Sequence, residues 1–259
     1  MFLESVAQRV ILALMAVFLV VTTGKDWYDF YTCGAVGQCL ADAGTLQFIT
    51  KFSMSLLLTV MAFVVSRDAF SRRDGRLLRI AFVFSFLADT SFSVIKLVVP
   101  SEHDLSDVLG IALFMVFQML LIYRHSRISD SDTSRPSGHL FLCGLLGAAA
   151  GIFGGGVLEL TLENVTIVTV AVYGVILTMS MVVGVLAPRK GYFPAKNARC
   201  IRWGMVAFFV GDVLVGLSLL SGEDHGALQT VSAISKNFIW WFYVPAQLMI
   251  IRACQKPKA

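Results

Sequence analysis

Charge is scarce in this chain: Asp, Glu, Lys and Arg together make up 15% of its 259 residues. A soluble domain of this length carries roughly 25%. Apolar residues make up 57% instead, and the mean hydropathy is +0.76. They fall in blocks of about 20 residues, the length that crosses a hydrocarbon core of about 30 Å. The composition therefore excludes an ordinary soluble domain and predicts an all-α, polytopic membrane protein.

Motifs for several common chemistries are also absent. The five cysteines and four histidines show no spacing typical of a metal site, and we expect no metal or organic cofactor. No Gly-x-Ser-x-Gly sequence occurs, which argues against an α/β-hydrolase-type serine esterase. Glycines are frequent over residues 144–156, but the Lys-Ser/Thr of a phosphate loop is missing there, so helix packing explains them better. Cys33 and Cys39 share the first expected outer loop. The sequence leaves open whether they form a disulfide there or remain free thiols.

The apolar blocks predict eight transmembrane helices in one integral membrane domain that covers residues 1–259. Their connections are short, which leaves no room for a soluble domain. The expected spans cover residues 5–23, 45–66, 77–99, 107–124, 139–160, 164–187, 200–220 and 229–251.

Charge placement predicts the orientation of these spans, because cytoplasmic loops carry an excess of Lys and Arg. Every second connection is cationic: Arg67, Arg72, Arg73, Arg76 and Arg79; Arg124, Arg127 and Arg135; Arg189, Lys190, Lys196, Arg199 and Arg202; and Arg252, Lys256 and Lys258 at the end. The alternate connections are acidic: Asp26, Asp29 and Asp42; Glu102, Asp104 and Asp107; Glu159 and Glu163; Glu223 and Asp224. Both termini are therefore expected in the cytoplasm, with the protein in the plasma or inner membrane. The net charge of +4 is a topology signal and indicates no binding to nucleic acid.

The chain is expected to contain two parallel four-helix halves, about residues 1–125 and 139–259. The stretch 126–138, rich in Ser, Asp and Pro, is typical of a flexible linker between them. The fourth and eighth spans end alike, in Gln118-Met-Leu-Leu-Ile and Gln247-Leu-Met-Ile-Ile. Parallel repeats of this kind place equivalent helices around an axis along the membrane normal.

Two aspartates lie in the middle of predicted spans, and each follows an arginine by ten residues. These aspartates are Asp89 and Asp212. Three lysines also lie inside predicted spans: Lys51, Lys96 and Lys236. Each buried charge costs about 2.5–3.5 kcal/mol, so these groups must pair, lose their charge or face a wet cavity. The lysines are expected in the outer third of the membrane and the aspartates near its middle. This arrangement predicts one cavity with carboxyl groups at its base and ammonium groups nearer its mouth.

Each of these residues also has a purely structural interpretation. Lys96 lies near a helix end, where a lysine reaches the membrane surface. Lys51 and Lys236 could be structural ion-pair partners of the aspartates. Asp89 and Asp212 could serve only as polar contacts between helices. Tyr243 and Gln247 are equally consistent with hydrogen bonds that hold helices together.

A series of short motifs gives the chain a resemblance to a known family. In chain order they are Lys51-FSMSLLL, Ala88-Asp89, Leu109-Gly110-x3-Phe114, Val172-Tyr173-x6-Ser180-Met181, Phe208-x3-Asp212 and Tyr243-x2-Ala246-Gln247-x-Met-Ile. In this order and at these depths the chain resembles the YhhN-like lysoplasmalogenases, small membrane proteins with eight spans. Two positions depart from the family pattern, with Phe52 in place of a proline and Gln118 near the place of a histidine. If that histidine transfers protons in other members of the family, its absence would make this chain slower, change its substrate or leave it inactive.

The resemblance implies hydrolysis of the vinyl ether bond of lysoplasmalogens, which releases a fatty aldehyde and glycerophosphoethanolamine or glycerophosphocholine. The two aspartates suit this chemistry. Protonation of the β-carbon of a vinyl ether gives an oxocarbenium ion that water captures, so a protonated carboxyl and an ionised one divide the work as in glycosidases. Asp89 and Asp212 are the predicted catalytic pair, with their individual roles open. Contacts to the lipid substrate are expected from Lys51, Gln118, Tyr173, Lys236, Tyr243 and Gln247, the two lysines holding its phosphate.

Two other classes of function remain open from the residues alone. A proton- or ion-coupled transporter or channel would also place ionisable residues within parallel repeats. Against it, Pro245 is the only proline deep within a predicted span, whereas transport sites usually have paired helix breaks. A retinal protein with Lys236 as its Schiff base is the third class, because seven helices remain without the first span.

Overall fold

The computed structural model describes residues 5–33, 40–95, 103–128, 162–218 and 227–257. Seven α-helices occupy these residues and confirm the all-α prediction. They are α1 (Val6–Cys33), α2 (Leu40–Val65), α3 (Arg72–Thr90), α5 (His103–His125), α7 (Leu162–Leu186), α8 (Ala195–Ser218) and α9 (Ala227–Arg252). The predicted fifth span at 139–160, Lys96 and Cys39 lie outside the described residues.

Six of the described helices are long and apolar enough to cross a membrane, so the chain is an integral membrane protein. Helix α9 is 26 residues long but is not among the six. Its first half is polar, because Ser232, Ser235, Lys236 and Asn237 follow one another within two turns. The helix predicted at 229–251 therefore exists, with less apolar character than the sequence blocks indicated.

The first helix is longer than predicted. The expected span ended at residue 23, whereas α1 continues to Cys33. An ion pair between Lys25 and Asp29, one turn apart, supports the added turns. Asp26 and Asp29 are therefore helical, and their assignment to a connecting loop was wrong.

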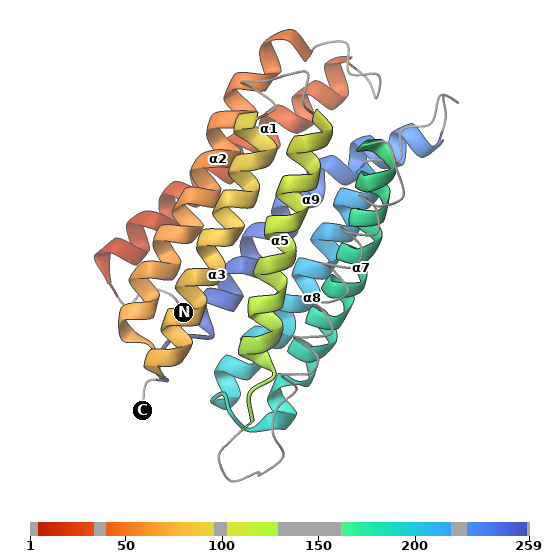
Figure 1. Ribbon diagram of the computed structural model, residues 1–259. Coiled ribbons are helices and arrows are strands. Elements are labelled where there is room, and N and C mark those ends of the chain that lie inside the picture. The colour runs from red at the N-terminus through yellow and green to blue at the C-terminus, as the bar shows by residue number, and fades with distance from the viewer. Residues whose placement is uncertain (1–4, 34–39, 96–102, 129–161, 219–226, 258–259) are drawn as a thin grey trace.

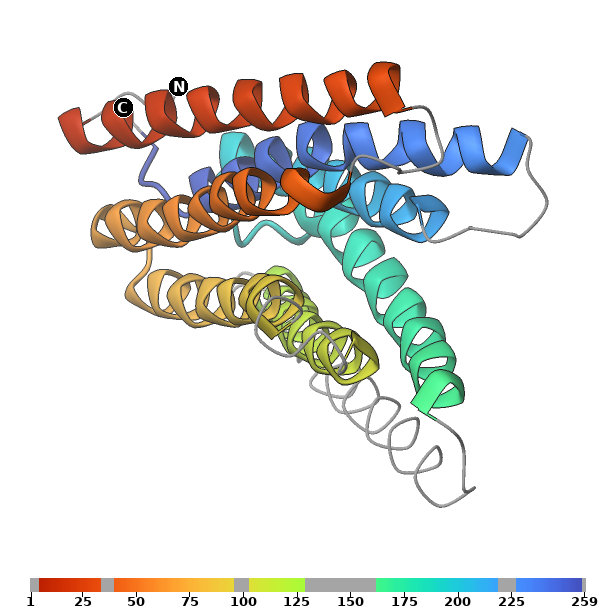
Figure 2. The same ribbon diagram turned by 90° about the horizontal axis from the view of Figure 1, so that it is seen from above.

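The helices form a bundle from which α7 slants away (Figure 2), and α1 lies on the outside against α2 and α9 (Figures 1 and 2). The tightest pair is α8 and α9, where Gly204 allows the two backbones to approach. A Cβ atom at Gly204 would lie 3.0 Å from the Ala246 carbonyl oxygen. Small residues at such a crossing are typical of membrane helices, where dispersion forces and close packing drive association.

The cationic connections gather at one end of the bundle, together with the C-terminal residues (Figure 1). There the Phe70 N–H donates to the Cys254 carbonyl at 3.0 Å, and the Lys256 N–H donates to the Asp68 carbonyl at 3.1 Å. The Asn197 amide donates to two further carbonyls of the tail, at 2.9 and 2.7 Å. The tail thus joins the α2–α3 connection to the start of α8.

A buried ion cluster lies at the same end and was not expected from the sequence, which indicated loop arginines in contact with water. Nε and Nη2 of Arg124 donate to the two carboxylate oxygens of Asp74 at 3.0 and 2.8 Å. Arg127 donates to the same carboxylate, and the Arg124 Nη1 donates to the Ile250 carbonyl at 3.2 Å. The cluster links α3, α5 and α9, and Asp74 and Arg124 are fully buried in it.

Candidate active site

Asp89 lies on α3 and faces α2 and α9. The Ser55 hydroxyl of α2 donates to Oδ2 of Asp89 at 2.5 Å, and the Tyr243 hydroxyl of α9 donates to the same oxygen at 2.8 Å. No described residue donates to Oδ1, which leaves that oxygen for a proton or a ligand. Three helices therefore hold the carboxyl in one orientation.

A chain of hydrogen bonds extends from this carboxyl toward the cationic end of the bundle. The Tyr243 hydroxyl lies 3.2 Å from the Ser85 hydroxyl, which accepts a hydrogen bond from the Gln247 amide at 3.2 Å. All three of these side chains are buried. Tyr243 and Gln247 therefore belong to the Asp89 centre, Tyr243 by direct contact and Gln247 through Ser85.

The helix that carries Asp89 changes its winding directly after the site. Residues Ser91–Ile95 form a π-helical segment, immediately after α3 ends at Thr90. Such segments are rare and are frequent at functional sites, because they rotate the following side chains relative to an α-helix. The apolar sequence pattern of this span gave no sign of the change.

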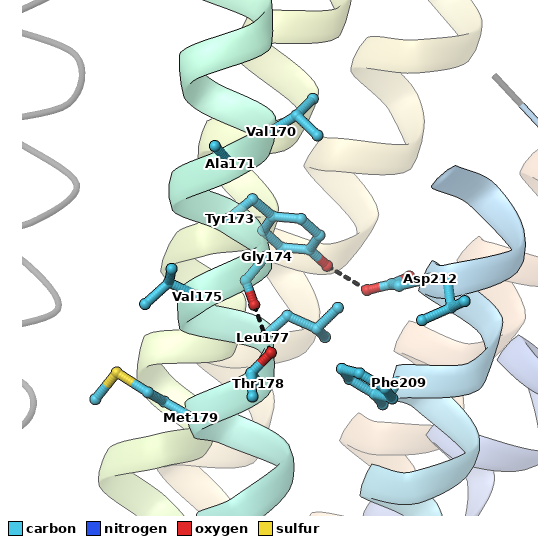
Figure 3. A pocket seen from close by; sticks show the side chains of 11 residues that line it. Val170, Ala171, Tyr173, Gly174, Val175, Leu177, Thr178, Met179, Phe209 and Asp212 are labelled. Carbon is cyan, nitrogen blue, oxygen red and sulfur yellow. Dashed lines mark hydrogen bonds between the residues drawn. The ribbon is translucent and has the colours of Figure 1, made fainter. Parts of the chain in front are cut away.

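Asp212 lies on α8 and meets Tyr173 of α7. The Tyr173 hydroxyl donates a short hydrogen bond to Oδ2 of Asp212, and Figure 3 shows the two side chains pointing toward each other across the gap between the helices. Each aspartate thus has a tyrosine as a donor. The tyrosines come from different helices, α9 for Asp89 and α7 for Asp212.

A cavity of about 600 Å³ opens beside Asp212, between α7 and α8. Its walls are mainly aliphatic and aromatic, with Tyr173, Thr178 and Asp212 as the polar groups (Figure 3). Pockets of this kind suit an elongated apolar ligand that meets a few polar atoms. The carboxyl of Asp212 is at the wall of this cavity, next to any ligand that binds there.

The two aspartate centres are neighbours. Asp89 and Asp212 are close enough to interact electrostatically, and each also interacts with the tyrosine of the other centre. Between them the ring of Tyr243 packs on Phe208, 5.6 Å between centroids, and Phe208 is one turn from Asp212 on α8. The structure therefore places the two carboxyls, from separate helices, within range of each other's charge.

Gln118 lies on α5 beside the same pair. Its side chain is fully buried and close to the Tyr173 hydroxyl, but outside hydrogen-bond geometry. Neither its amide oxygen nor its amide nitrogen bonds to any described residue. Buried polar groups without a partner are rare, and an amide in this position is available to a water molecule or a substrate.

Neither Lys51 nor Lys236 forms an ion pair with Asp89 or Asp212, although Lys51 lies one turn of α2 from Ser55, the donor to Asp89. Lys51 pairs with Asp26 of α1 at 3.9 Å and interacts electrostatically with Lys236, which is exposed and makes no ion pair with a described residue. Their interpretation as ion-pair partners of Asp89 and Asp212 was therefore wrong. The two lysines interact with each other electrostatically, but neither lines the cavity beside Asp212, so one cavity with the ammonium groups at its mouth stays a prediction.

Two contributors to the site were missed by sequence reasoning. Ser55 is the donor nearest to Asp89, although a serine in an apolar span carries no distinctive signal. Asp26 lies on a helix that was expected to have ended before it. The helical spacing of Lys51 and Ser55, four residues apart, was the one signal that connected the lysine to the aspartate centre. Among the described residues, no group of three or more His, Cys, Asp or Glu side chains is arranged to hold a metal ion.

Comparison with known proteins gives one result. A family model described as the YhhN family matches residues 46–254, which contain both aspartates, both tyrosines and both lysines and leave out the whole of α1. No curated protein and no solved structure matches the chain.

Proposed function

The chain belongs to the YhhN family, and from that premise we propose that it is a lysoplasmalogenase-like hydrolase embedded in the membrane. It cleaves the vinyl ether bond of lysoplasmalogens to a fatty aldehyde and glycerophosphoethanolamine or glycerophosphocholine. The observation that carries the proposal is the pair of neighbouring carboxyls, Asp89 and Asp212. Each accepts a tyrosine hydrogen bond, and one lies at the wall of an apolar cavity.

The reaction requires one proton donor, one water molecule and stabilisation of a cation. A carboxylic acid protonates the β-carbon of the vinyl ether, which leaves an oxocarbenium ion at the α-carbon. Water adds to that carbon and loses a proton, and the resulting hemiacetal collapses to the aldehyde and the free glycerol hydroxyl. An ionised carboxylate nearby stabilises the cation and accepts the proton from water, and transfer of that proton back to the first carboxyl then restores the starting state of the pair.

The hydrogen bonds support one assignment of the two roles. Hydrogen bonds donated to a carboxylate favour its ionised form, and Asp89 accepts two, from Ser55 and Tyr243. Asp212 accepts one, from Tyr173, and borders the cavity in which the chain of the lipid would lie. Asp212 is therefore the proton donor in this proposal, and Asp89 is the carboxylate that stabilises the cation.

The remaining residues orient the reactants. Gln118 holds the attacking water, because its buried amide offers both a donor and an acceptor beside the Tyr173 hydroxyl. Tyr173 fixes the rotamer of Asp212, and Gln247 acts through Ser85 on Tyr243. Lys51 and Lys236 hold the lipid phosphate as point charges, and the cavity between α7 and α8 accepts the alkenyl chain.

A comparison of two lipid classes tests the proposal. Purified protein is incubated with alkenyl and acyl lysolipids that share one headgroup and one chain length, and both aldehyde and fatty acid are measured. Aldehyde from the alkenyl lipid, with no fatty acid from the acyl lipid, is the expected result. Fatty acid release alone would indicate an esterase, and release of neither product would refute hydrolysis.

The transporter predicted as an alternative has less support in the described helices. Pro245 is the only proline inside one of them, and α9 runs through it without interruption. A coupled carrier usually places interrupted helices in both halves around its site. Flux of a proton or ion in proteoliposomes, in the absence of hydrolysis, would favour this class.

A further inference from the structure

The outer part of α1 places a carboxylate beside the two lysines. Asp26 lies 3.9 Å from the Lys51 ammonium and accepts a hydrogen bond from the Gln47 amide at 2.7 Å on Oδ1. Among the described residues no donor reaches its Oδ2. A strong charge-assisted hydrogen bond is about 2.7–2.9 Å long, so the pairing of Asp26 with Lys51 is loose and leaves both groups open to a better partner.

The position of α1 is fixed by contacts on either side of this group. One turn before Asp26, the Thr22 hydroxyl donates to the Thr50 hydroxyl at 2.7 Å in a buried contact. One residue after it, Trp27 meets Phe238 of α9 with ring centroids 5.9 Å apart. The helix therefore presents Asp26 to α2 and α9, the two helices that carry the lysines.

Few charged side chains lie around this position among the described residues. Lys25 and Asp29 pair with each other and also act on Asp26 electrostatically. The other described groups are Asp26, Lys51 and Lys236, one carboxylate and two ammonium groups. The two ammonium groups are close enough to repel each other. An anion between them relieves that repulsion and draws Lys51 away from Asp26, so that Asp26 then requires a different cation.

The spacing from Asp89 corresponds to a glycerol backbone. Lys51 and Ser55 lie on one face of α2, one turn or about 6 Å apart along the axis, and Ser55 bonds to Asp89. In a lysoplasmalogen five covalent bonds separate the ether oxygen from the phosphorus, which is about 6 Å when extended. A lipid with its vinyl ether at Asp89 therefore brings its phosphate to the lysines.

We propose that Asp26, Lys51 and Lys236 form the headgroup site of a zwitterionic lysophospholipid. The lysines bind the phosphodiester, and Asp26 binds the primary amine of the headgroup. The inference rests on the proposed function for the identity of the lipid. It gives α1, which lies entirely outside the family match, a role in selecting ethanolamine over uncharged or anionic headgroups.

The test measures binding and requires no turnover. Saturated alkyl lysolipids with phosphoethanolamine, N-acetylphosphoethanolamine or phosphoglycerol headgroups lack the vinyl ether, and their affinities for the purified protein are compared. The unmodified amine is expected to bind about 10-fold more tightly than the other two, as one charge-assisted hydrogen bond implies. Equal affinities for all three headgroups in the wild-type protein would overturn the proposal, and this comparison does not depend on any variant.

Variants then locate the effect. Asp26→Asn is expected to remove the preference for the amine while phosphoglycerol binding stays unchanged or rises, and Asp26→Glu is expected to keep it. The control is Asp68→Asn, an exposed carboxyl of the α2–α3 connection at the cationic end of the bundle, which should leave all affinities unchanged. Lys51→Met and Lys236→Met should weaken every headgroup alike. Equal loss for all headgroups in Asp26→Asn would reduce Asp26 to a partner of Lys51 and contradict the inference.

The two proposals fail in different ways. Amine selectivity without aldehyde release from alkenyl lipids would retain the headgroup site and reject the hydrolase. Aldehyde release without amine selectivity would retain the hydrolase and reject the headgroup site.

Discussion

Removing the Tyr173 hydroxyl, which bonds to Asp212, distinguishes a catalytic role of the two aspartates from a purely structural one. Tyr173→Phe removes the hydrogen bond to Asp212 while it keeps the ring. A hydrogen bond to a charged or ionisable group contributes about 1.5–3 kcal/mol, so kcat for aldehyde release should fall about 10- to 100-fold. Tyr31→Phe serves as the control because Tyr31 is 78% exposed. Unchanged kcat in Tyr173→Phe would remove this residue from the mechanism.

The thiol of Cys254 gives a pH-dependent prediction outside the spans. Burial raises the pKa of this thiol to about 12, although Arg124 beside it acts in the opposite direction. Only the thiolate is reactive, and at pH 9 about one thousandth of the groups would be ionised. N-ethylmaleimide should therefore leave Cys254 unlabelled up to pH 9 in the folded protein and label it after unfolding, as measured by mass spectrometry of peptides. Rapid labelling of folded protein at pH 8 would contradict the burial of the tail.

Single residues divide into those that the sequence could identify and those that it could not. Asp89 and Asp212 were found because carboxyls in apolar spans are costly and therefore few. Ser55 was missed because a serine in a membrane helix costs little and satisfies itself on its own backbone. Asp74 was missed because an acidic residue among arginines resembles an ordinary loop, and only the folded chain buries it.

At the scale of helices, the crossing of α8 and α9 depends on one glycine. A Cβ at Gly204 meets the Ala246 carbonyl oxygen at 3.0 Å and side chains of Ile250 and Met249 at 3.1 Å. Gly204→Val should therefore separate the helices and lower the free energy of unfolding by about 1–3 kcal/mol. Because Tyr243 is carried by α9, activity should fall as well.

Gly216 provides the matched control on the same helix, because a Cβ there meets no atom within 4 Å. Gly216→Val should leave both stability and activity near wild type in thermal unfolding and aldehyde assays. Equal effects of the two substitutions would indicate that the close approach of α8 and α9 is unimportant.

Seven of the eight predicted helices lie among the described residues, in the predicted order. The ends were less predictable, since α1 passes ten residues beyond the expected limit to Cys33. Local pairs such as Lys25 with Asp29, and contacts with α2 and α9, extend it, and neither is visible in hydropathy. The π-helical segment after Asp89 also escaped, because its cause lies in packing against neighbouring helices.

At the scale of the whole molecule, the Asp74 cluster is expected to stabilise the cationic end of the bundle. Asp74→Asn leaves Arg124 buried without its partner, and removal of one member of a buried pair costs about 3–5 kcal/mol. Unfolding in denaturant should show this loss, while Asp68→Asn, an exposed residue of the neighbouring connection, should show almost none. Similar stability in both variants would mean that water reaches the cluster.

The membrane character of the molecule and its family were predictable from composition and motif order, since 57% apolar residues and a fixed series of short motifs survive without any coordinates. The gathering of cationic connections at one end agrees with the predicted alternation. Which side of the membrane that end faces, and the division into two halves at 126–138, stay predictions. No sequence pattern indicated that the chain end would lie against the α2–α3 connection, because the contacts are made by backbone atoms.

Aldehyde release by Asp89→Asn and Asp212→Asn is the most direct test of the shared carboxyl site. With alkenyl lysophosphoethanolamine as substrate and Asp68→Asn as the folded control, each of the two variants should lose activity by a factor of about 100 or more, and the double variant should be little worse than either. Wild-type rates in either single variant, in protein that remains folded, would contradict a mechanism in which the two carboxyls act together.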